Sequence, residues 1–505
     1  MNAAAATRDH ALERARRHFD SGDFFADLAR RVACRSESQD PDAAPLLRAY
    51  LADEIAPALA ALGFETRLHD NPEPRFGPLL VATRHEHESL PTVLMYGHGD
   101  VIRGQDASWT RGRGPWQLTQ EGERLYGRGS ADNKGQHSIN LAALAQVLAE
   151  RGARLGFNIK VLLETGEETG SPGLAAFCAA ERQALAADVL IASDGPRQRR
   201  DLPTVFLGSR GVANFDLSLT LREGAHHSGN WGGLLRNPGT VLANAIACLV
   251  DGRGRILIEA LRPPPIPVNV RAALAGLEFG GDAGDPAVDA DWGEPGLSPA
   301  ERVIGWNTLE VLAYRCGNPD QPVNAIPPSA RATLHLRHVV GTDLSELAAK
   351  VRAHLARHGF DDIVVDRVTA SAATRLDPDN PWVRFSLDSI ARSTGVAPVL
   401  LPNLGGSLPN EVFADILGLP TIWVPHSYGA CNQHAPDEHL LAPLARQALE
   451  LMTGLFWDLG EQAAMLPRRM ASPPDSRMAS PPDSLRASPL ESRAVSSLDP
   501  RAAAA

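Results

Sequence analysis

Three short apolar runs constrain the fold of this 505-residue chain more than any other feature of its sequence. They are "PTVLMYGHGD" (91–100), "FNIKVLLETGEETGS" (157–171) and "ADVLIASDGP" (187–196), and each ends in a polar turn that contains glycine. Apolar runs of this length are typical of strands that are buried on both faces. Between the first two, "HSINLAALAQVLAERG" (137–152) predicts a helix that ends at a glycine. Strands that alternate with helices predict an α/β fold with a mostly parallel sheet and helices on both of its faces.

The middle of the chain predicts a second, α+β domain. From about residue 212 the strands alternate, in "ANFDLSLTLREG" and "ARATLHLRHVV", and each is followed by a predicted helix. The sheet-type pattern returns in "LPTIWVPHS" (419–427). We therefore expect residues 212–373 to be inserted into a discontinuous first domain formed by residues 1–211 and 374–463. Within the insertion, residues 262–300 are rich in Pro, Gly and Asp, and we interpret them as a long surface excursion.

The two ends of the chain differ in character. Residues 8–63 carry apolar positions at three- and four-residue spacing and are expected to be helical. At the other end, "RMASPPDS" occurs twice in tandem (469–476 and 477–484). Because Ser, Pro and Arg with few apolar residues cannot bury enough surface to become ordered, residues 464–505 are predicted to be a disordered tail.

Composition excludes several classes of protein. The net charge of -11 argues against a nucleic-acid binder, which needs a clustered basic face. The N-terminus is charged where a signal peptide is apolar, and no run approaches the roughly 20 apolar residues of a membrane span. The five cysteines are scattered and odd in number, which suits a reducing compartment. We expect a cytoplasmic protein with neither a nucleic acid nor a membrane as partner.

Acidic and imidazole side chains gather at the ends of the predicted strands and in two further turns. They are His98, Asp100, Asp132, Glu167, Glu168, Asp194 and His434. In open α/β sheets, ligand sites form outside the carboxyl ends of the strands. Each of these residues alone is commonplace, as a turn residue, a helix cap or a polar strand end. Together they predict one site.

Two histidines and several carboxylates are the ligands that a pair of zinc ions needs, with a position left open for water. Asp132, a short side chain in the tight turn "YGRGSADNKGQ", is expected to bridge the two ions. Asp100 is expected to orient the ring of His98. Of Glu167 and Glu168, one would bind metal and the other would act as general base, and the residues alone leave open which. Mn²⁺ or Co²⁺ are possible substitutes, since such ligand sets select weakly.

The motifs "MYGHGDV", "GRGSADNKG", "ETGEETGS", "ASDGP" and "QHAPDEHL" resemble those of a di-zinc metallopeptidase family. That family includes carnosinase-type dipeptidases, aminoacylases, acetylornithine deacetylase, succinyl-diaminopimelate desuccinylase and carboxypeptidase G2. The resemblance covers roughly residues 20–463. It implies two zinc ions per subunit, one held by His98 and Asp194 and the other by Glu168 and His434, with Asp132 as the bridge.

The resemblance also assigns roles outside the metal ligands. It implies that Glu167 is the general base and that the inserted segment is a lid through which the protein forms a homodimer. "EGAHHSGNWGG" resembles the lid motif whose histidine stabilises the oxyanion in the partner's site, here His227 rather than its neighbour His226. The residues that resemble the family's substrate contacts are Arg337, Asn324, Gly406 and Ser407.

These features predict a zinc-dependent hydrolase of the dipeptidase or carboxypeptidase type. It would use a metal-activated water to cleave a peptide or N-acyl amide bond next to a free carboxylate. An N-acyl-amino-acid deacylase is the alternative, because it would share every catalytic residue. A homologue that binds metal or amino acids without catalysis is the remaining alternative, but all five ligands and Glu167 are present.

Overall fold

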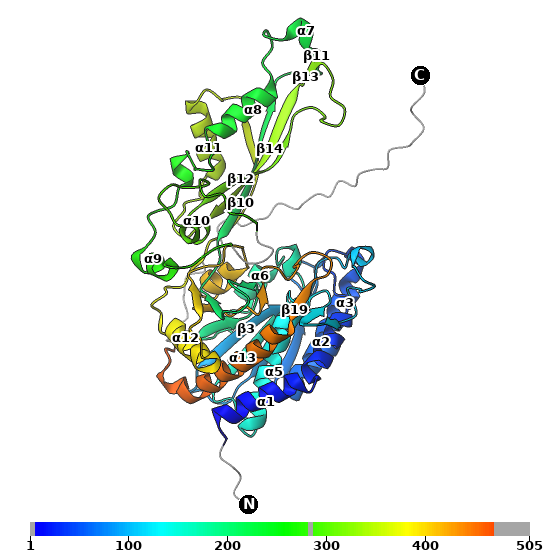
Figure 1. Ribbon diagram of the computed structural model, residues 1–505, viewed down its shortest axis with the longest axis vertical. Helices are drawn as coiled ribbons and strands as arrows, with labels where there is room; N and C mark the ends of the chain where they lie inside the picture. Colours follow the sequence, from blue (N-terminus) through cyan, green and yellow to red (C-terminus); the bar gives the residue numbers. More distant parts are fainter. Residues whose placement is uncertain (1–5, 281–285, 469–505) are drawn as a thin grey trace, which may run out of the picture. The chain divides into compact units, whose positions relative to one another are not determined.

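The computed structural model describes residues 6–280 and 286–468 (Figure 1). Within these ranges the chain forms one eight-stranded central sheet. Its strands, in spatial order, are β1 (Glu65–His69), β2 (Leu79–Arg84), β6 (Asn158–Glu164), β3 (Thr92–His98), β7 (Val189–Ala192), β17 (Thr421–Trp423), β9 (Thr204–Phe206) and β16 (Val399–Leu401). The pairs β6–β3, β3–β7, β7–β17 and β9–β16 are parallel. The expected mostly parallel sheet is confirmed, with antiparallel strands β1 and β2 at one edge.

Helices cover both faces of this sheet, as expected. Along β3, Val93 and Met95 face one hydrophobic core, and Leu94 and Tyr96 face the other. The first core contains side chains of α5 (Lys134–Glu150), α12 (Pro381–Thr394) and α13 (Ala442–Gln462), and the second contains those of α6 (Leu174–Ala180). Because both faces of β3 are buried, its sequence is apolar at nearly every position.

The N-terminal segment is helical, as its spacing predicts. Its elements are α1 (Arg8–Asp20), α2 (Asp23–Ala33), a 3-10 turn (Pro41–Ala43), α3 (Ala44–Ala49), a π-helical turn (Tyr50–Ile55) and α4 (Ala56–Ala61). Two small sheets accompany the central sheet. One is formed by β19 (His439–Leu441), β5 (Arg124–Tyr126) and β4 (Thr119–Glu121), and the other by β18 (Ser427–Tyr428) and β8 (Pro196–Arg197).

The inserted α+β domain has its own sheet and its own hydrophobic core. Its four strands are, in spatial order, β12 (Thr308–Arg315), β14 (Ser329–His338), β10 (Gly211–Thr220) and β15 (Val364–Ser371). Alternate residues of β10 pack with α8 (Pro238–Ala247) and α11 (Leu347–Arg357). The expected alternating strands are β10 and β14, whereas β12 and β15 were not predicted. A separate two-stranded sheet joins β11 (His226–His227) to β13 (Ala325–Ile326), and α7 (Ser228–Trp231) follows β11 (Figure 1).

The segment interpreted as a surface excursion, residues 262–300, is more ordered than its composition suggests. It contains α9 (Val268–Leu274) and leads into α10 (Pro299–Ile304). Ile266, Val270 and Ile304 bury their side chains together in a small core of their own. Asn403 also donates to the carbonyl of Ile304 at 3.1 Å. Two short helices and a few buried side chains therefore anchor this segment, while most of its described residues are exposed, as expected of a surface excursion.

The connections between the two parts run side by side. Thr374 donates from its backbone to the carbonyl of Ser209 at 3.0 Å, and Leu376 donates to that of Leu207 at 2.8 Å. Between them, Gly208 approaches the carbonyl of Thr374 so closely that a Cβ atom would collide with it. These contacts fix the point at which the chain leaves the central sheet and returns to it.

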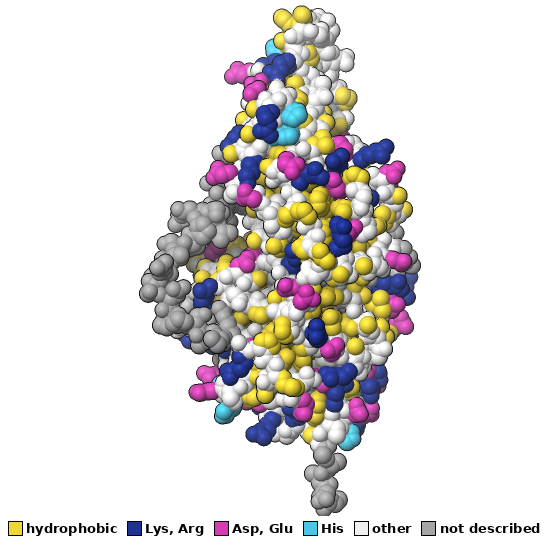
Figure 2. All heavy atoms as spheres, turned by 90° about the vertical axis from the view of Figure 1, so that its left-hand side faces the viewer, with side chains coloured by type: hydrophobic (Ala, Val, Ile, Leu, Met, Phe, Trp, Pro, Cys, Tyr) yellow, Lys and Arg dark blue, Asp and Glu magenta, His cyan; other side chains and the backbone are white. Residues whose placement is uncertain are grey.

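The described chain ends shortly after α13. Residues Ala463–Met465 form a 3-10 turn, and Arg468 donates to the carbonyls of Glu88 and Ser89. The rest of the predicted disordered tail, from residue 469, lies outside the described residues. Among the helices that are described, none is both long and apolar enough to cross a membrane. Figure 2 shows basic and acidic side chains interspersed over the described part of one face, without an extended field of one sign.

Candidate metal centre

Neighbouring strands bring the predicted site residues together. Strands β6, β3 and β7 are parallel and adjacent, so their carboxyl ends lie at the same edge of the sheet. His98 is the last residue of β3, Glu167 begins a 3-10 turn just after β6, and Asp194 follows β7 by two residues. This order of strands places three segments that are distant in sequence around one point.

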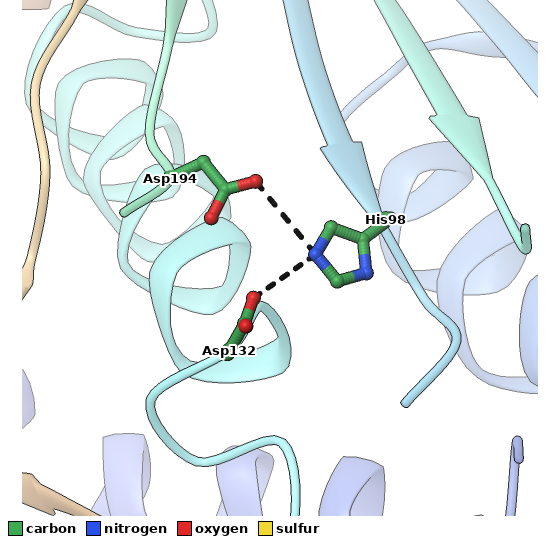
Figure 3. Close-up of side chains that lie close together, drawn as sticks. All are labelled: His98, Asp132 and Asp194. Carbon is green, nitrogen blue, oxygen red and sulfur yellow. Dashed lines mark hydrogen bonds and ion pairs between the residues drawn. The ribbon is translucent and has the colours of Figure 1, made fainter. Parts of the chain in front are cut away.

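The first cluster contains His98, Asp132 and Asp194, all buried (Figure 3). The Nε2 atom of His98 lies 3.1 Å from Oδ1 of Asp132 and 3.7 Å from Oδ2 of Asp194. Figure 3 shows both carboxyl groups directed toward the same edge of the imidazole ring. The Oδ2 atom of Asp194 is buried and has no hydrogen-bond partner within the described residues. Burying such an oxygen costs free energy unless a ligand binds it.

The second cluster shares Asp132 with the first. The Nε2 atom of His434 lies 3.1 Å from Oδ2 of Asp132 and 3.0 Å from Oε2 of Glu168. Asp132 therefore directs one carboxylate oxygen to each of the two histidines, which is the geometry expected of a bridging ligand. His434 has a backbone φ of 63°, in the left-handed region that a non-glycine residue rarely adopts. Such backbone conformations cluster at functional sites.

Asp100 connects His98 to the turn that carries the two glutamates. The Nδ1 atom of His98 donates to the backbone carbonyl of Asp100 at 3.1 Å and lies 3.4 Å from its carboxylate. The same carboxylate accepts the backbone N–H groups of Glu167 and Glu168 at 3.2 and 3.1 Å. Asp100 therefore contacts both the imidazole ring and the glutamate turn. Its second contact was not predicted.

The site concentrates negative charge in a buried place. Burial, together with the charge of Asp132, raises the pKa of Glu168 to about 7 and that of Asp194 to about 6. Burial also raises the pKa of Glu167 well above its usual range, and nearby carboxylates add to this effect. Hydrogen bonds to Asp132 and Glu168 raise the pKa of His434 to about 10. The cluster holds more carboxylates than imidazoles, so it is electrostatically incomplete without a cation.

A buried ion pair that the motif analysis missed supports the Asp132 turn. Glu438 and Arg128 are both buried, and their side chains meet at 2.8 Å. The Glu438 carboxylate also accepts the backbone N–H groups of Gly129, Ala131 and Asp132 at 3.1, 2.9 and 3.1 Å. Glu438 lies in the motif "CNQHAPDEHL", four residues after His434, but nothing local in the sequence indicates its distant partner.

Asn133 is a second support that sequence reasoning did not identify. Its amide donates to the carbonyl of Ser193 at 2.8 Å, next to Asp194. Its side-chain oxygen accepts the backbone N–H of His98 at 3.4 Å. Asn133 thus joins the strand ends that carry His98 and Asp194 to its own neighbour Asp132. The peptide bond between Asp132 and Asn133 is cis.

The predicted substrate contacts divide into two groups, and the first lies beside a cavity. Arg337 of β14 donates from Nη1 to the hydroxyl of Ser407 at 2.9 Å, next to Gly406. The Ser407 hydroxyl in turn donates to the backbone carbonyl of Arg210 at 2.8 Å. A cavity of about 550 Å³ is lined on this side by Leu404 and Gly405.

The second group lies in the inserted domain. Asn324 immediately precedes β13, and its carbonyl accepts the backbone N–H of Ser228 at 2.9 Å, next to His227. His227 pairs with Ala325 across the β11–β13 sheet, so the two predicted residues lie at the same small sheet. Within the described residues, no hydrogen bond or ion pair joins His227 to the carboxylates of the metal centre.

The residues present fit two divalent cations. The two groups that hold potential ligand atoms within 4.8 Å of one another are His98, Asp132 and Asp194, and Asp132, Glu168 and His434. The unpartnered oxygen of Asp194 and the excess of carboxylates both favour a bound cation there. Imidazole and carboxylate are ligands that zinc accepts.

Comparison with known proteins agrees with this arrangement. Residues 94–458 match the family described as "Peptidase family M20/M25/M40". The chain is 31% identical over 476 residues to the Beta-Ala-His dipeptidase of Mus musculus, covering 87% of this chain and 93% of the mouse protein. It is 28% identical over 372 residues to the cysteinylglycine-S-conjugate dipeptidase of Corynebacterium striatum, covering 71% and 78% of the two chains.

A solved structure shares the fold. An M20 family metallo-carboxypeptidase from Sulfolobus solfataricus superposes with a TM-score of 0.72 at 24% identity, covering 86% of this chain and 99% of that chain. The family resemblance predicted from the five motifs is thereby confirmed: the chain belongs to peptidase family M20/M25/M40.

Proposed function

We propose that the protein is a dipeptidase that uses two zinc ions to hydrolyse a peptide bond next to a free carboxylate. Membership of the family gives the reaction class, hydrolysis of a peptide bond. The observation that carries the proposal is the position of Asp132, which directs one oxygen to His98 and the other to His434. The dipeptidases among the curated relatives favour a dipeptide over an N-acyl amino acid as substrate.

In this proposal the metal ligands divide as the motifs imply. His98 and Asp194 hold one ion, Glu168 and His434 hold the other, and Asp132 binds both. When bound, the two ions supply Lewis acidity that polarises the scissile carbonyl and lowers the pKa of water. Zinc is the proposed metal because the ligands are imidazoles and carboxylates, and manganese or cobalt are possible substitutes.

Glu167 is the proposed general base. Its carboxylate lies 4.0 Å from His98 and its backbone N–H is held by Asp100. It accepts a proton from the attacking water as the water oxygen bonds to the carbonyl carbon. It then gives that proton to the leaving nitrogen as the C–N bond breaks. The raised pKa of Glu167 suits a group that must both accept and release a proton.

The remaining residues position the substrate. Arg337, with the backbone of Gly406 and Ser407, is proposed to bind the free carboxylate of the substrate. His227 and Asn324 are proposed to reach the metal centre of a partner subunit, where His227 stabilises the oxyanion. Their shared two-stranded sheet supports a common role, because one movement of the lid would deliver both.

A homodimer through the lid domain is proposed on the same grounds. Strand β12 is an edge strand of the lid sheet, and its Val311, Leu312 and Tyr314 side chains are exposed. An edge of this kind is a surface on which a second strand pairs. A cytoplasmic location is also proposed, because all five cysteines are unpaired.

A substrate panel with defined metal content tests the function. Purified protein is assayed by turnover of dipeptides, N-acetyl amino acids and longer N-acyl amino acids, before and after chelation and again after zinc is restored. We expect about two zinc ions per chain and a dipeptide as the best substrate. Higher kcat/KM for N-acyl amino acids would establish the deacylase instead. Full activity in chelated protein with at most one ion would exclude the two-metal site.

A further inference from the structure

We propose that Arg210 is a second arginine of the substrate-carboxylate site and acts beside Arg337. This inference rests on the proposed function and assigns a specificity-determining role to a residue that lies at the connection between the two domains. Arg210 immediately precedes β10, the first strand of the inserted domain. The motif "LGSRG" contains it, but its sequence context alone assigns it no role.

Arg210 is built into the loop that carries Gly406 and Ser407. Its backbone N–H donates to the carbonyl of Leu404 at 3.1 Å, and its Nε donates to the carbonyl of Gly405 at 2.9 Å. Its own carbonyl accepts the Ser407 hydroxyl at 2.8 Å. Three contacts therefore fix Arg210 against this loop, so its guanidinium is held in place before any substrate arrives.

The Ser407 hydroxyl is already committed. It donates its one proton to the backbone carbonyl of Arg210, and it accepts a hydrogen bond from the guanidinium of Arg337 at 2.9 Å. The expected donation from this hydroxyl to a substrate carboxylate therefore competes with an existing bond. A carboxylate at this position needs other donors, and the guanidinium groups of Arg210 and Arg337 are the strongest donors beside the loop.

The guanidinium of Arg210 has an unused donor. Arg210 is 8% exposed, and its Nη1 atom is buried without a hydrogen-bond partner. Within the described residues, neither Arg210 nor Arg337 forms an ion pair with a carboxylate. The acidic group that acts on Arg210 is Glu310, which is not within ion-pair distance. A buried cation without a partner is costly, and an anion that binds to it recovers that cost.

Arg337 also disfavours the charge of Arg210. Burial is the larger cause and the charge of Arg337 the next, and together they lower the pKa of Arg210 to about 10. Burial lowers the pKa of Arg337 as well. The Arg337 guanidinium contacts Ser407 and that of Arg210 contacts Gly405, so two cations are held against one loop and an anion would balance their charge. A cavity of about 550 Å³ borders the same loop at Leu404 and Gly405.

The test compares one dipeptide substrate with its C-terminal amide in wild-type protein and in Arg210→Gln. The ratio of the two kcat/KM values measures what the enzyme gains from the carboxylate. We expect this ratio to fall by about 10- to 100-fold in Arg210→Gln, because a charged hydrogen bond is lost only with the carboxylate substrate. Arg210→Lys keeps the positive charge but lacks the planar guanidinium with its paired donors. Its ratio should therefore lie between those of the wild type and Arg210→Gln.

A structural role would give a different result. If Arg210 only held the loop, the variant would lose activity on both substrates equally and the ratio would stay at the wild-type value, which would overturn the inference. Arg31→Gln is the matched control, because Arg31 is also buried and donates to the Ser138 hydroxyl at 2.6 Å, but does not line the cavity beside the loop. Its ratio should equal that of the wild type.

If Arg210→Gln turns over neither substrate, the same comparison is made by binding. Calorimetry then measures the affinities of the product amino acid and of its amide for the metal-replete protein. A loss confined to the amino acid supports the inference, and an equal loss overturns it. A wild-type protein that cleaves no carboxylate-bearing substrate would contradict the proposed function instead, so the two failures are distinguishable.

Discussion

The carboxylate of Glu438 accepts a hydrogen bond from the backbone N–H of Asp132 at 3.1 Å, across 306 positions of sequence. The same side chain pairs with buried Arg128 and accepts two further N–H groups of the turn. Four hydrogen bonds thus tie the C-terminal segment that carries His434 to the turn that carries Asp132. The shared ligand of the two metal clusters depends on this tie for its position.

Glu438→Gln tests this dependence. The variant loses the charge that neutralises Arg128 and at least one of the four acceptor contacts, so we expect the free energy of unfolding to fall by about 3–5 kcal/mol. Zinc content measured after dialysis should fall as well. Asp458→Asn is the control, because Asp458 is also buried and bound by Arg8 at 2.9 Å, but it lies in α13 and its carboxylate accepts from Ser389 of α12. This control should lose stability and retain zinc. Equal zinc loss in both variants would show that the contacts of Glu438 with the Asp132 turn do not position the metal ligands.

Asp100→Asn tests what the carboxylate of Asp100 contributes. An amide accepts only one of the two backbone N–H groups that the carboxylate now accepts from Glu167 and Glu168. We expect zinc affinity and turnover to fall by about 10- to 100-fold, as for other supports of metal-binding histidines. Competition with a chelator of known affinity measures the first, and kcat at saturating zinc measures the second. Unchanged values for both would show that His98 and the glutamate turn hold their positions without Asp100.

Glu167→Gln and Glu168→Gln form a matched pair, since the residues are neighbours with different proposed roles. Glu167→Gln should keep two zinc ions and lose turnover by about 10²-fold or more, because a positioned general base is removed. Glu168→Gln should instead lose zinc from the site that it shares with His434, which its carboxylate meets at 3.0 Å. Zinc analysis and kcat are measured on the same preparations. If Glu167→Gln lost zinc and Glu168→Gln retained it, Glu167 would be the metal ligand and Glu168 the general base.

The half-buried side chain of Glu411 predicts a pH dependence of stability. Burial raises its pKa from 4.5 to about 7, and its Oε2 atom has no hydrogen-bond partner among the described residues. Between these pH values the folded protein holds a proton that the unfolded chain has lost. The contribution of Glu411 to the free energy of unfolding therefore falls as the pH rises from about 4.5 to about 7.

Glu411→Gln should remove this slope. Denaturant titrations at pH 4.5 and pH 8 should give similar stability at the lower pH and a variant that is more stable by about 2–3 kcal/mol at the higher pH. Glu223→Gln, at an exposed position, should follow the wild-type curve. Parallel curves for wild type and Glu411→Gln would show that Glu411 ionises alike in the folded and unfolded chains.

Local signals explain which parts of the molecule could be predicted from sequence. His98, Glu167 and Asp194 each follow an apolar run, so the run predicts a strand and the order of strands predicts that their ends meet. The ion pair of Glu438 and Arg128 has no such signal, because its two halves are far apart and each is an ordinary charged residue.

Other features were hidden for related reasons. Helices α9 and α10 lie in a Pro- and Gly-rich segment whose composition masks their short apolar faces. Strands β12 and β15 are edge strands of the lid sheet with mostly exposed residues, so their pattern lacks the burial that marks β10. The role proposed for Arg210 depends on an unpaired donor, which only coordinates reveal.

The last prediction concerns the proposed role of His227 in a partner subunit. His227 lies in the β11–β13 sheet beside Asn324, and none of its described contacts is with a metal-site carboxylate. If it acts in the site of a partner subunit, His227→Ala and Glu167→Ala should each be nearly inactive, since removal of an oxyanion donor costs about 10²–10³ in kcat. Mixing the two variants should restore activity. Random exchange makes about half of the dimers hybrid, and one of the two sites in each hybrid has both residues intact, so about a quarter of all sites should recover.

Exchange is verified by a mass difference between the two chains, and His226→Ala is the control, which should need no complementation. Verified exchange without recovered activity would place His227 in the site of its own chain or outside catalysis.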